Sequence, residues 1–105
     1  MAQGDLTKVV EYDKIEVVNT WDIQVRKATK VMEEQADGSK KELTRSFHRH
    51  VLQPFTSGKD SDGKWTHTAT DISGEDASVQ AIANAAWTDS VKTAYKTFRE
   101  RQPTP

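Results

Sequence analysis

The segment RSFHRH at residues 45–50 places two histidines and two arginines around one aromatic ring. Side chains alternate between the two faces of a strand, so His48 and His50 project together, away from Phe47. Two imidazoles at this spacing can bind zinc, and His67 is the candidate for a third ligand. Histidines on a solvated strand are also common as plain polar residues, so we assign no metal and keep these three only as candidates.

Basic residues around this segment offer a second chemistry, the binding of nucleic acid. Lysine and arginine neutralise phosphates, while rings such as Trp21 and Phe47 can stack on bases. Glutamates lie among these cations, and 15 basic residues against 16 acidic ones give a formal charge of -1. The basic face of the sheet is therefore our alternative interpretation. Its candidate residues are Arg26, Lys27, Lys30, Lys41, Arg45 and Arg49.

The familiar catalytic and cofactor-binding motifs are absent from the sequence. It has no Gly-x-Ser-x-Gly segment, no Walker lysine loop and no dinucleotide fingerprint. It also has no cysteine, which excludes disulfides and thiolate chemistry. The acidic segment at residues 60–63 lacks the later acidic ligand of a calcium loop. We therefore predict a protein without enzymatic activity and without a cofactor.

Strands must position the candidate residues. Alternating β-branched and polar residues from Lys14 to Leu52 predict a three-stranded antiparallel β-meander. Asn19-Thr20 marks the first reversal, and Asp37-Gly38 supplies the freedom that the second requires. We expect Ile15, Val17, Ile23, Val25, Thr29 and Val31 on one apolar face, and Phe47 in the core between Leu43 and Val51.

The second half of the chain predicts a loop and then helices. Pro54 ends the sheet, and residues 55–71 are so rich in glycine, serine, threonine and aspartate that we expect a long polar loop. Ser73 offers a cap for a helix. The apolar stripe changes phase after Trp87, which predicts two helices, or one kinked helix, with Thr88 capping the second.

These elements define an α+β fold in which the helices pack on one face of the meander. We expect a single domain over residues 1–105, and the free edges of three strands favour a homo-oligomer. Its predicted parts are a 1–12 N-terminal extension, a 13–54 β-meander, a 55–72 loop, a 73–101 helical region and a 102–105 frayed tail.

The sequence also bears on membrane insertion, on secretion and on contact with a partner. No apolar run approaches the roughly 20 residues that cross a bilayer, and the start lacks the pattern of a signal peptide, so we expect neither membrane insertion nor secretion by such a signal.

Trp65 and Trp21 are the candidates for contact with a partner, and Trp65 is favoured because it lies in the predicted loop. The expected core aromatics are Trp21, Phe47, Trp87, Tyr95 and Phe98.

Three segments in this order resemble short uncharacterised proteins of tailed bacteriophages, including those of marine cyanobacteria. The segments are KIEVVNTWDIQVRKATKVMEE, SFHRHVLQP and DISGEDASVQAIANAAWTDSVKTAY. The resemblance implies a virion-associated or assembly component, found in the virion or the host cytoplasm, with itself or other phage structural proteins as partners. No catalytic residue transfers from the group, whose activity is not settled.

Overall fold

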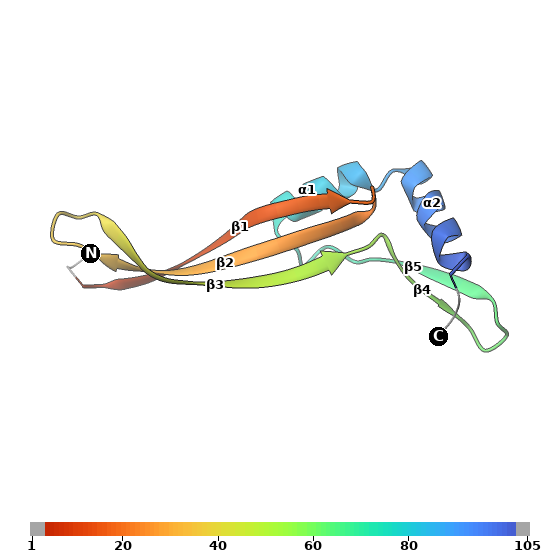
Figure 1. Ribbon diagram of the computed structural model, residues 1–105, viewed down its shortest axis with the longest axis horizontal. Coiled ribbons are helices and arrows are strands. Elements are labelled where there is room, and N and C mark those ends of the chain that lie inside the picture. The colour runs from red at the N-terminus through yellow and green to blue at the C-terminus, as the bar shows by residue number, and fades with distance from the viewer. Residues whose placement is uncertain (1–3, 103–105) are drawn as a thin grey trace. The chain divides into compact units, whose positions relative to one another are not determined.

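The computed structural model describes residues 4–102 and has the predicted α+β architecture (Figure 1). Three long antiparallel strands form one sheet in the order β1-β2-β3, and two short strands form a second. Compact unit one comprises Met1–Ile15 and Val25–His50, and unit two comprises Glu16–Gln24 and Val51–Pro105. The elements are β1 (Leu6–Val18), β2 (Asp22–Glu34), β3 (Lys40–Leu52), β4 (Phe55–Lys59), β5 (Trp65–Ala69), α1 (Ala77–Ala86) and α2 (Asp89–Glu100).

Strand β1 begins at Leu6, so the expected extension over residues 1–12 is largely part of the sheet. Pairing with β2 continues beyond its start, because Gly4 N–H donates to the carbonyl of Glu34 and Glu34 N–H donates to that of Asp5. Only residues 19–21 separate β1 from β2, and the two strands have the same length of 13 residues, so they pair along their whole extent. Residues 1–3, and residues 103–105 of the predicted frayed tail, lie outside the described residues.

The turn between β1 and β2 holds two residues other than glycine in the left-handed region. Asn19 has φ 56° and Thr20 has φ 68°. Positive φ at both central positions is the signature of a type I′ turn, whose twist suits a two-residue hairpin. Asparagine tolerates this region well, but a β-branched threonine is strained there. The turn between β2 and β3 instead uses Gly38, at φ 88°.

The expected polar loop over residues 55–72 is wrong for most of its length. Strands β4 and β5 pair there as an antiparallel hairpin, with Phe55 opposite Ala69 and Ser57 opposite His67. Asp60 holds the turn, since its Oδ1 accepts from the backbone N–H groups of Asp62 and Lys64. Threonines alternate with aromatic residues in β5, and this period-two pattern outweighs the low hydrophobicity.

The two predicted helices are confirmed, with the break at Trp87 and Thr88. Thr88 Oγ1 accepts from Val91 N–H at 3.3 Å and caps α2. The cap of α1 is Asp76 rather than the expected Ser73, and its carboxylate accepts from Ser78 N–H at 3.1 Å. Asp76 is the better cap because its carboxylate is negatively charged and accepts a hydrogen bond from a backbone N–H at the positive end of the helix dipole.

Unit two holds most of the buried apolar side chains. Trp21 packs beside its helices, with its ring 5.6 Å from that of Tyr95 and 5.2 Å from that of Phe98. Phe98 keeps 43% of its surface exposed, so its expected place in the core is wrong. It lies near the C-terminal end of α2, where Trp21 covers only part of its ring. Among the described residues of unit two, the buried hydrophobic side chains are those of Ile23, Val79, Ala83, Trp87 and Tyr95.

Unit one buries little apolar surface. Val25 and Ala28 are its only buried hydrophobic residues among those described. Phe47 and Leu43 remain 45% and 47% exposed, so the expected core around Phe47 is wrong. The Arg26 guanidinium lies 4.5 Å from the centre of the Phe47 ring, where an apolar neighbour was expected. Alternation on β3 indicates which side chains share a face, but within unit one no described element covers that face.

The other positions of the expected apolar face are also only partly covered. Ile15, Thr29 and Val31 are half-buried. Val17 and Val51 are exposed.

Candidate interaction surfaces

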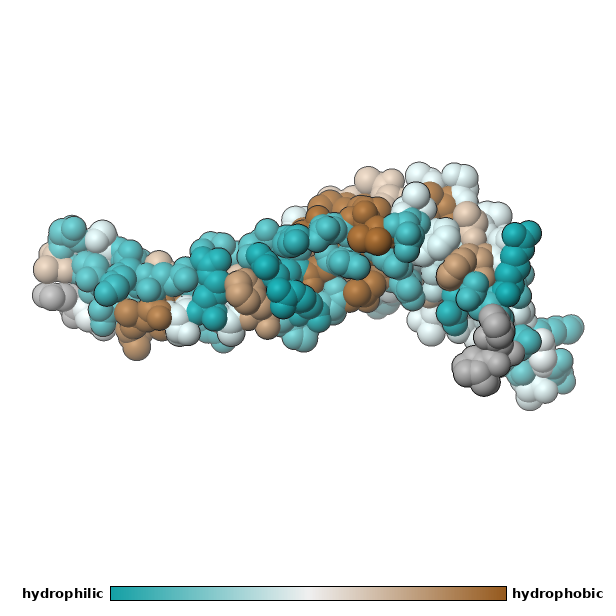
Figure 2. All heavy atoms as spheres, in the orientation of Figure 1, coloured by the Kyte–Doolittle hydropathy of each residue, from teal (hydrophilic) through white to brown (hydrophobic). Residues whose placement is uncertain are grey.

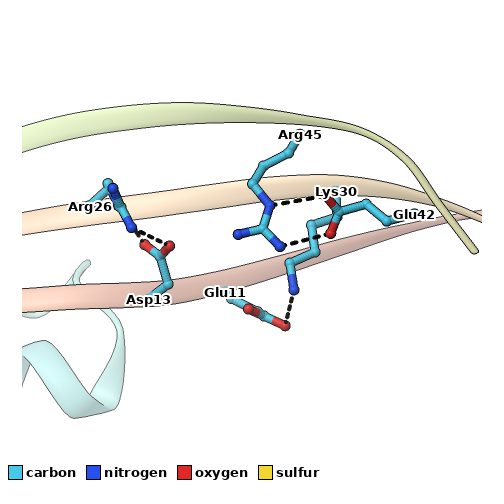
Figure 3. Close-up of polar contacts among 6 residues, drawn as sticks. All are labelled: Glu11, Asp13, Arg26, Lys30, Glu42 and Arg45. Carbon is cyan, nitrogen blue, oxygen red and sulfur yellow. Dashed lines mark hydrogen bonds and ion pairs between the residues drawn. The ribbon is translucent and has the colours of Figure 1, made fainter.

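Ion pairs join β1 to β2 on one face of unit one (Figure 3). Arg26 donates to both carboxylate oxygens of Asp13, at 3.0 Å from Nε and 2.8 Å from Nη2. This two-point geometry is the strongest form of an ion pair. Lys30 Nζ donates to Glu11 Oε1 at 2.9 Å. Ala28 lies between these two cations on the same face and is fully buried, which is consistent with their long side chains covering it.

Strand β3 extends the same charged surface. Arg45 donates to Glu42 at 3.2 and 2.7 Å. Lys40 Nζ lies 4.0 Å from an oxygen of Glu34. The resulting ion-pair face comprises Glu11, Asp13, Arg26, Lys30, Glu42 and Arg45.

The ion-pair face is electrically balanced. The hydrogen bond from Arg26 lowers the pKa of Asp13, and that from Arg45 lowers the pKa of Glu42. The same bonds raise the pKa of both guanidinium groups. In both of these pairs the partner favours the charged form of each group, and the pairs compensate one another at close range.

The nucleic-acid candidates are only partly brought together. Arg26, Lys30 and Arg45 meet carboxylates on the ion-pair face. The guanidinium of Arg49 lies 5.6 Å from the centre of the Phe47 ring. A phosphate would therefore compete with carboxylates for three of these cations. Of the remaining candidates, Lys27 is half-buried and Lys41 is exposed.

The histidine candidates separate into two settings. His48 and His50 lie side by side in unit one, with ring centres 5.9 Å apart, as the alternation predicts. His67 instead contacts Ser57 and Glu100 in unit two. Residues 4–102 contain no group of three or more histidine, cysteine or acidic side chains arranged to hold a metal ion.

Strand β3 presents an open edge. Among the described strands β3 is hydrogen-bonded to β2 alone, which leaves its other side as an edge of the sheet. Every residue from Lys40 to Arg49 is exposed, and we call this segment the β3 edge. Hydrophilic residues dominate the face seen in Figure 2, and apolar residues form separate patches among them. The β3 edge is the most exposed long segment of the described sheet.

The two tryptophan candidates differ in their surroundings. Trp21 is engaged by α2, as its ring contacts show. Trp65 is half-buried and stacks on His67, with ring centres 6.1 Å apart and planes 6° apart. The ammonium of Lys59 lies 5.5 Å from the Trp65 ring. Trp65 is therefore packed against residues of its own hairpin and stays partly exposed.

A chain of three polar side chains, which the sequence did not reveal, joins the hairpin to α2. Ser57 Oγ lies 2.7 Å from His67 Nδ1, and His67 Nε2 lies 2.7 Å from Glu100 Oε2. Cross-strand pairing places Ser57 directly opposite His67. Recognising β4 and β5 as a hairpin would have predicted the first contact, whereas the second depends on where α2 packs.

The arrangement of strands and helices defines the class of the protein by its fold, which is α+β. No protein-family model, curated protein or solved structure matches the chain. Neither helix within residues 4–102 has the length and apolar character needed to cross a membrane.

Proposed function

We propose that the chain is a non-enzymatic interaction protein that associates with copies of itself. We further propose a virion-associated or assembly role in a tailed bacteriophage, in the virion or the host cytoplasm. That setting depends on the resemblance of the three sequence segments and on no structural observation. The uncovered sheet of unit one supports the self-association.

Unit one has too little core of its own. Its described residues bury only Val25 and Ala28 among hydrophobic side chains, while Leu6 and Val10 join Leu43 and Phe47 on the exposed surface. Three strands gain independent stability when one hydrophobic face is covered. A partner that covers these residues would supply the missing burial, at roughly 25 cal/mol for each Å² of apolar surface.

A second copy of the chain suits this surface. The β3 edge offers backbone groups that an added strand can pair with, and side chains that the same strand would cover. The ion-pair face is balanced, and the formal charge of the chain is only -1, so two copies repel each other weakly. Paired cations also make this face a poorer site for nucleic acid, which remains the alternative function.

The test is mass measurement by light scattering after size exclusion, at low and moderate salt, with and without short DNA. We expect a discrete oligomer that resists salt and ignores DNA. Phe47→Ser should lower its mass. The matched control is Phe98→Ser, since Phe98 is exposed to a similar extent but packs beside Trp21 and lies outside the β3 edge, and it should leave the mass unchanged. A monomer that gains mass only with DNA would establish the alternative instead.

A second measurement tests the absence of enzymatic activity. Ser57, His67 and Glu100 have the composition of a hydrolytic triad, although serine contacts Nδ1 here and Nε2 in the serine proteases. We expect no hydrolysis of p-nitrophenyl acetate above the rate in buffer. Turnover that disappears in Ser57→Ala would overturn this part of the proposal.

A further inference from the structure

A groove of about 320 Å³ opens on unit two, between the start of β4 and one side of α2. Its apolar lining includes Leu52 and Phe55, and its polar lining includes Ser57, Tyr95 and Arg99. The volume is at the lower end of the range for small-molecule sites. A ligand of this groove would be small and would meet an apolar wall and a polar wall.

Arg99 sets the charge of the groove. It is the only charged residue among the described residues that line it. Its Nε is buried and has no hydrogen-bond partner, so no carboxylate within residues 4–102 neutralises the guanidinium at that atom. The adjacent Glu100 is instead bonded to His67. The described lining of the groove therefore carries one positive charge and no negative one, and a guanidinium whose Nε is buried and unbonded favours an anionic partner.

The polar wall is held in place before any ligand arrives. Tyr95 OH donates to Gln53 Oε1 at 3.2 Å, and Gln53 Nε2 donates to Asp22 Oδ1 at 3.0 Å. Thr70 also donates to the backbone carbonyl of Gln53. Gln53 thereby links Tyr95 to one oxygen of the Asp22 carboxylate. Burial raises the pKa of Tyr95, which keeps its hydroxyl protonated at neutral pH.

The apolar wall is flat. The ring of Phe55 stacks near that of Tyr95, with centres 6.4 Å apart and planes 27° apart. The ammonium of Lys96 lies 4.7 Å from the centre of the Phe55 ring, which helps to fix the ring. Planar apolar groups pack well against such a surface.

We propose that this groove binds a small organic carboxylate, with its charge on the Arg99 guanidinium and its apolar body against Phe55 and Leu52. A single guanidinium matches the single charge and the two oxygens of a carboxylate, whereas a phosphate dianion usually needs further cations. The ligand could be a free small acid or the C-terminal carboxylate of a peptide. The inference does not depend on self-association through the β3 edge.

The experiment is a titration of the full chain with sodium phenylacetate, followed by backbone amide NMR shifts. We expect saturable shifts at the start of β4 and along α2. Phenylacetamide, which has the same shape without the charge, should bind about tenfold more weakly or worse. Equal binding of the two compounds, or no saturable shift with either, would overturn the proposal without reference to any variant.

Substitutions then assign the charge to one residue. Arg99→Gln should weaken phenylacetate binding by about tenfold or more, and Arg99→Lys by less. The matched control Arg101→Gln removes a neighbouring arginine that does not line the groove and should bind normally. Unchanged binding by Arg99→Gln would contradict the assignment.

Two further ligands separate the possible sources of the anion. N-acetyl-glycyl-phenylalanine binding more tightly than phenylacetate would identify a peptide terminus, and weaker binding would identify a free acid. Either result supports a carboxylate site. Inorganic phosphate that causes the same shifts with equal affinity would show a general anion site and overturn the carboxylate assignment.

Discussion

The indole nitrogen of Trp87 donates a 2.8 Å hydrogen bond to the backbone carbonyl of Trp21. Trp87 ends α1 and is buried, while Trp21 follows the turn between β1 and β2. This bond therefore ties the junction of the two helices to the tip of the long hairpin within unit two. Such a bond is costly to lose, because the carbonyl is left without a donor.

The substitution Trp87→Phe tests how much this hydrogen bond contributes to stability. We expect a loss of about 1–3 kcal/mol in the free energy of unfolding, since phenylalanine keeps most of the buried ring but cannot donate. Urea denaturation followed by circular dichroism measures the change. Trp65→Phe is the control, because it makes the same change of side chain at a half-buried tryptophan whose contacts are made by its ring. It measures the cost of the smaller ring without the loss of the bond to Trp21. Equal losses for the two variants would mean that the bond contributes nothing beyond packing.

The strained turn between β1 and β2 gives a stabilising substitution. Thr20 has φ 68°, which costs a residue with a side chain roughly 1–2 kcal/mol. Thr20→Gly removes that strain and creates the preferred pair for a type I′ turn, at the expense of greater freedom in the unfolded chain. We expect a net gain of about 0.5–1 kcal/mol, measured by thermal unfolding.

A second threonine provides the comparison for that prediction. Thr44 lies within β3, where glycine loses entropy without relieving strain. Thr44→Gly should therefore destabilise the protein by about 0.5–1 kcal/mol. A loss of stability in Thr20→Gly similar to that in Thr44→Gly would contradict the strained conformation of the turn.

The ion pair between Asp13 and Arg26 predicts a dependence of stability on pH. The pKa of Asp13 in the folded protein is below its ordinary value of 3.8. The folded state therefore favours the charged carboxylate, and the pair stabilises the fold above that value. This contribution disappears as the pH falls through the lowered pKa. Asp13→Asn should be less stable than the wild type at pH 7, and the difference should vanish in strong acid.

Partner substitution and salt check the origin of that effect. Arg26→Gln should remove the same pH-dependent contribution, and the double variant should add little to either single change. High salt should shrink the difference at pH 7, because the pair lies at the surface. A wild type and an Asp13→Asn variant that lose stability in parallel down to acid pH would disprove the role of this pair.

Local signals predicted much of the fold. Thr88 was assigned as a cap from helical phase alone, and Asp37-Gly38 was assigned as a turn from its backbone freedom. Both depend on interactions within a few residues, which the sequence contains directly. The hairpin of β4 and β5 was missed because its residues are polar, although the alternation of Trp65 and His67 with threonines indicates a strand.

Long-range relationships could not be predicted in the same way. Alternation indicated that Phe47 shares a face with its neighbours, but burial requires a covering element, and unit one supplies none over this ring. The contact of His67 with Glu100 and the placing of Arg99 in a groove both depend on how α2 packs beside β4. These are tertiary results, which periodicity in a single sequence does not determine.

Within unit two, Trp65 is the residue that we expect to contact a partner molecule. Its ring stacks on His67 but stays partly exposed, so its removal exposes little new surface. Trp65→Ala should cost about 1 kcal/mol or less in stability, which is the value of one stacked pair. The same change should weaken partner binding, measured by the mass of the oligomer as the protein is diluted. A loss of stability of several kcal/mol would show instead that Trp65 is part of the core, as cavity formation requires.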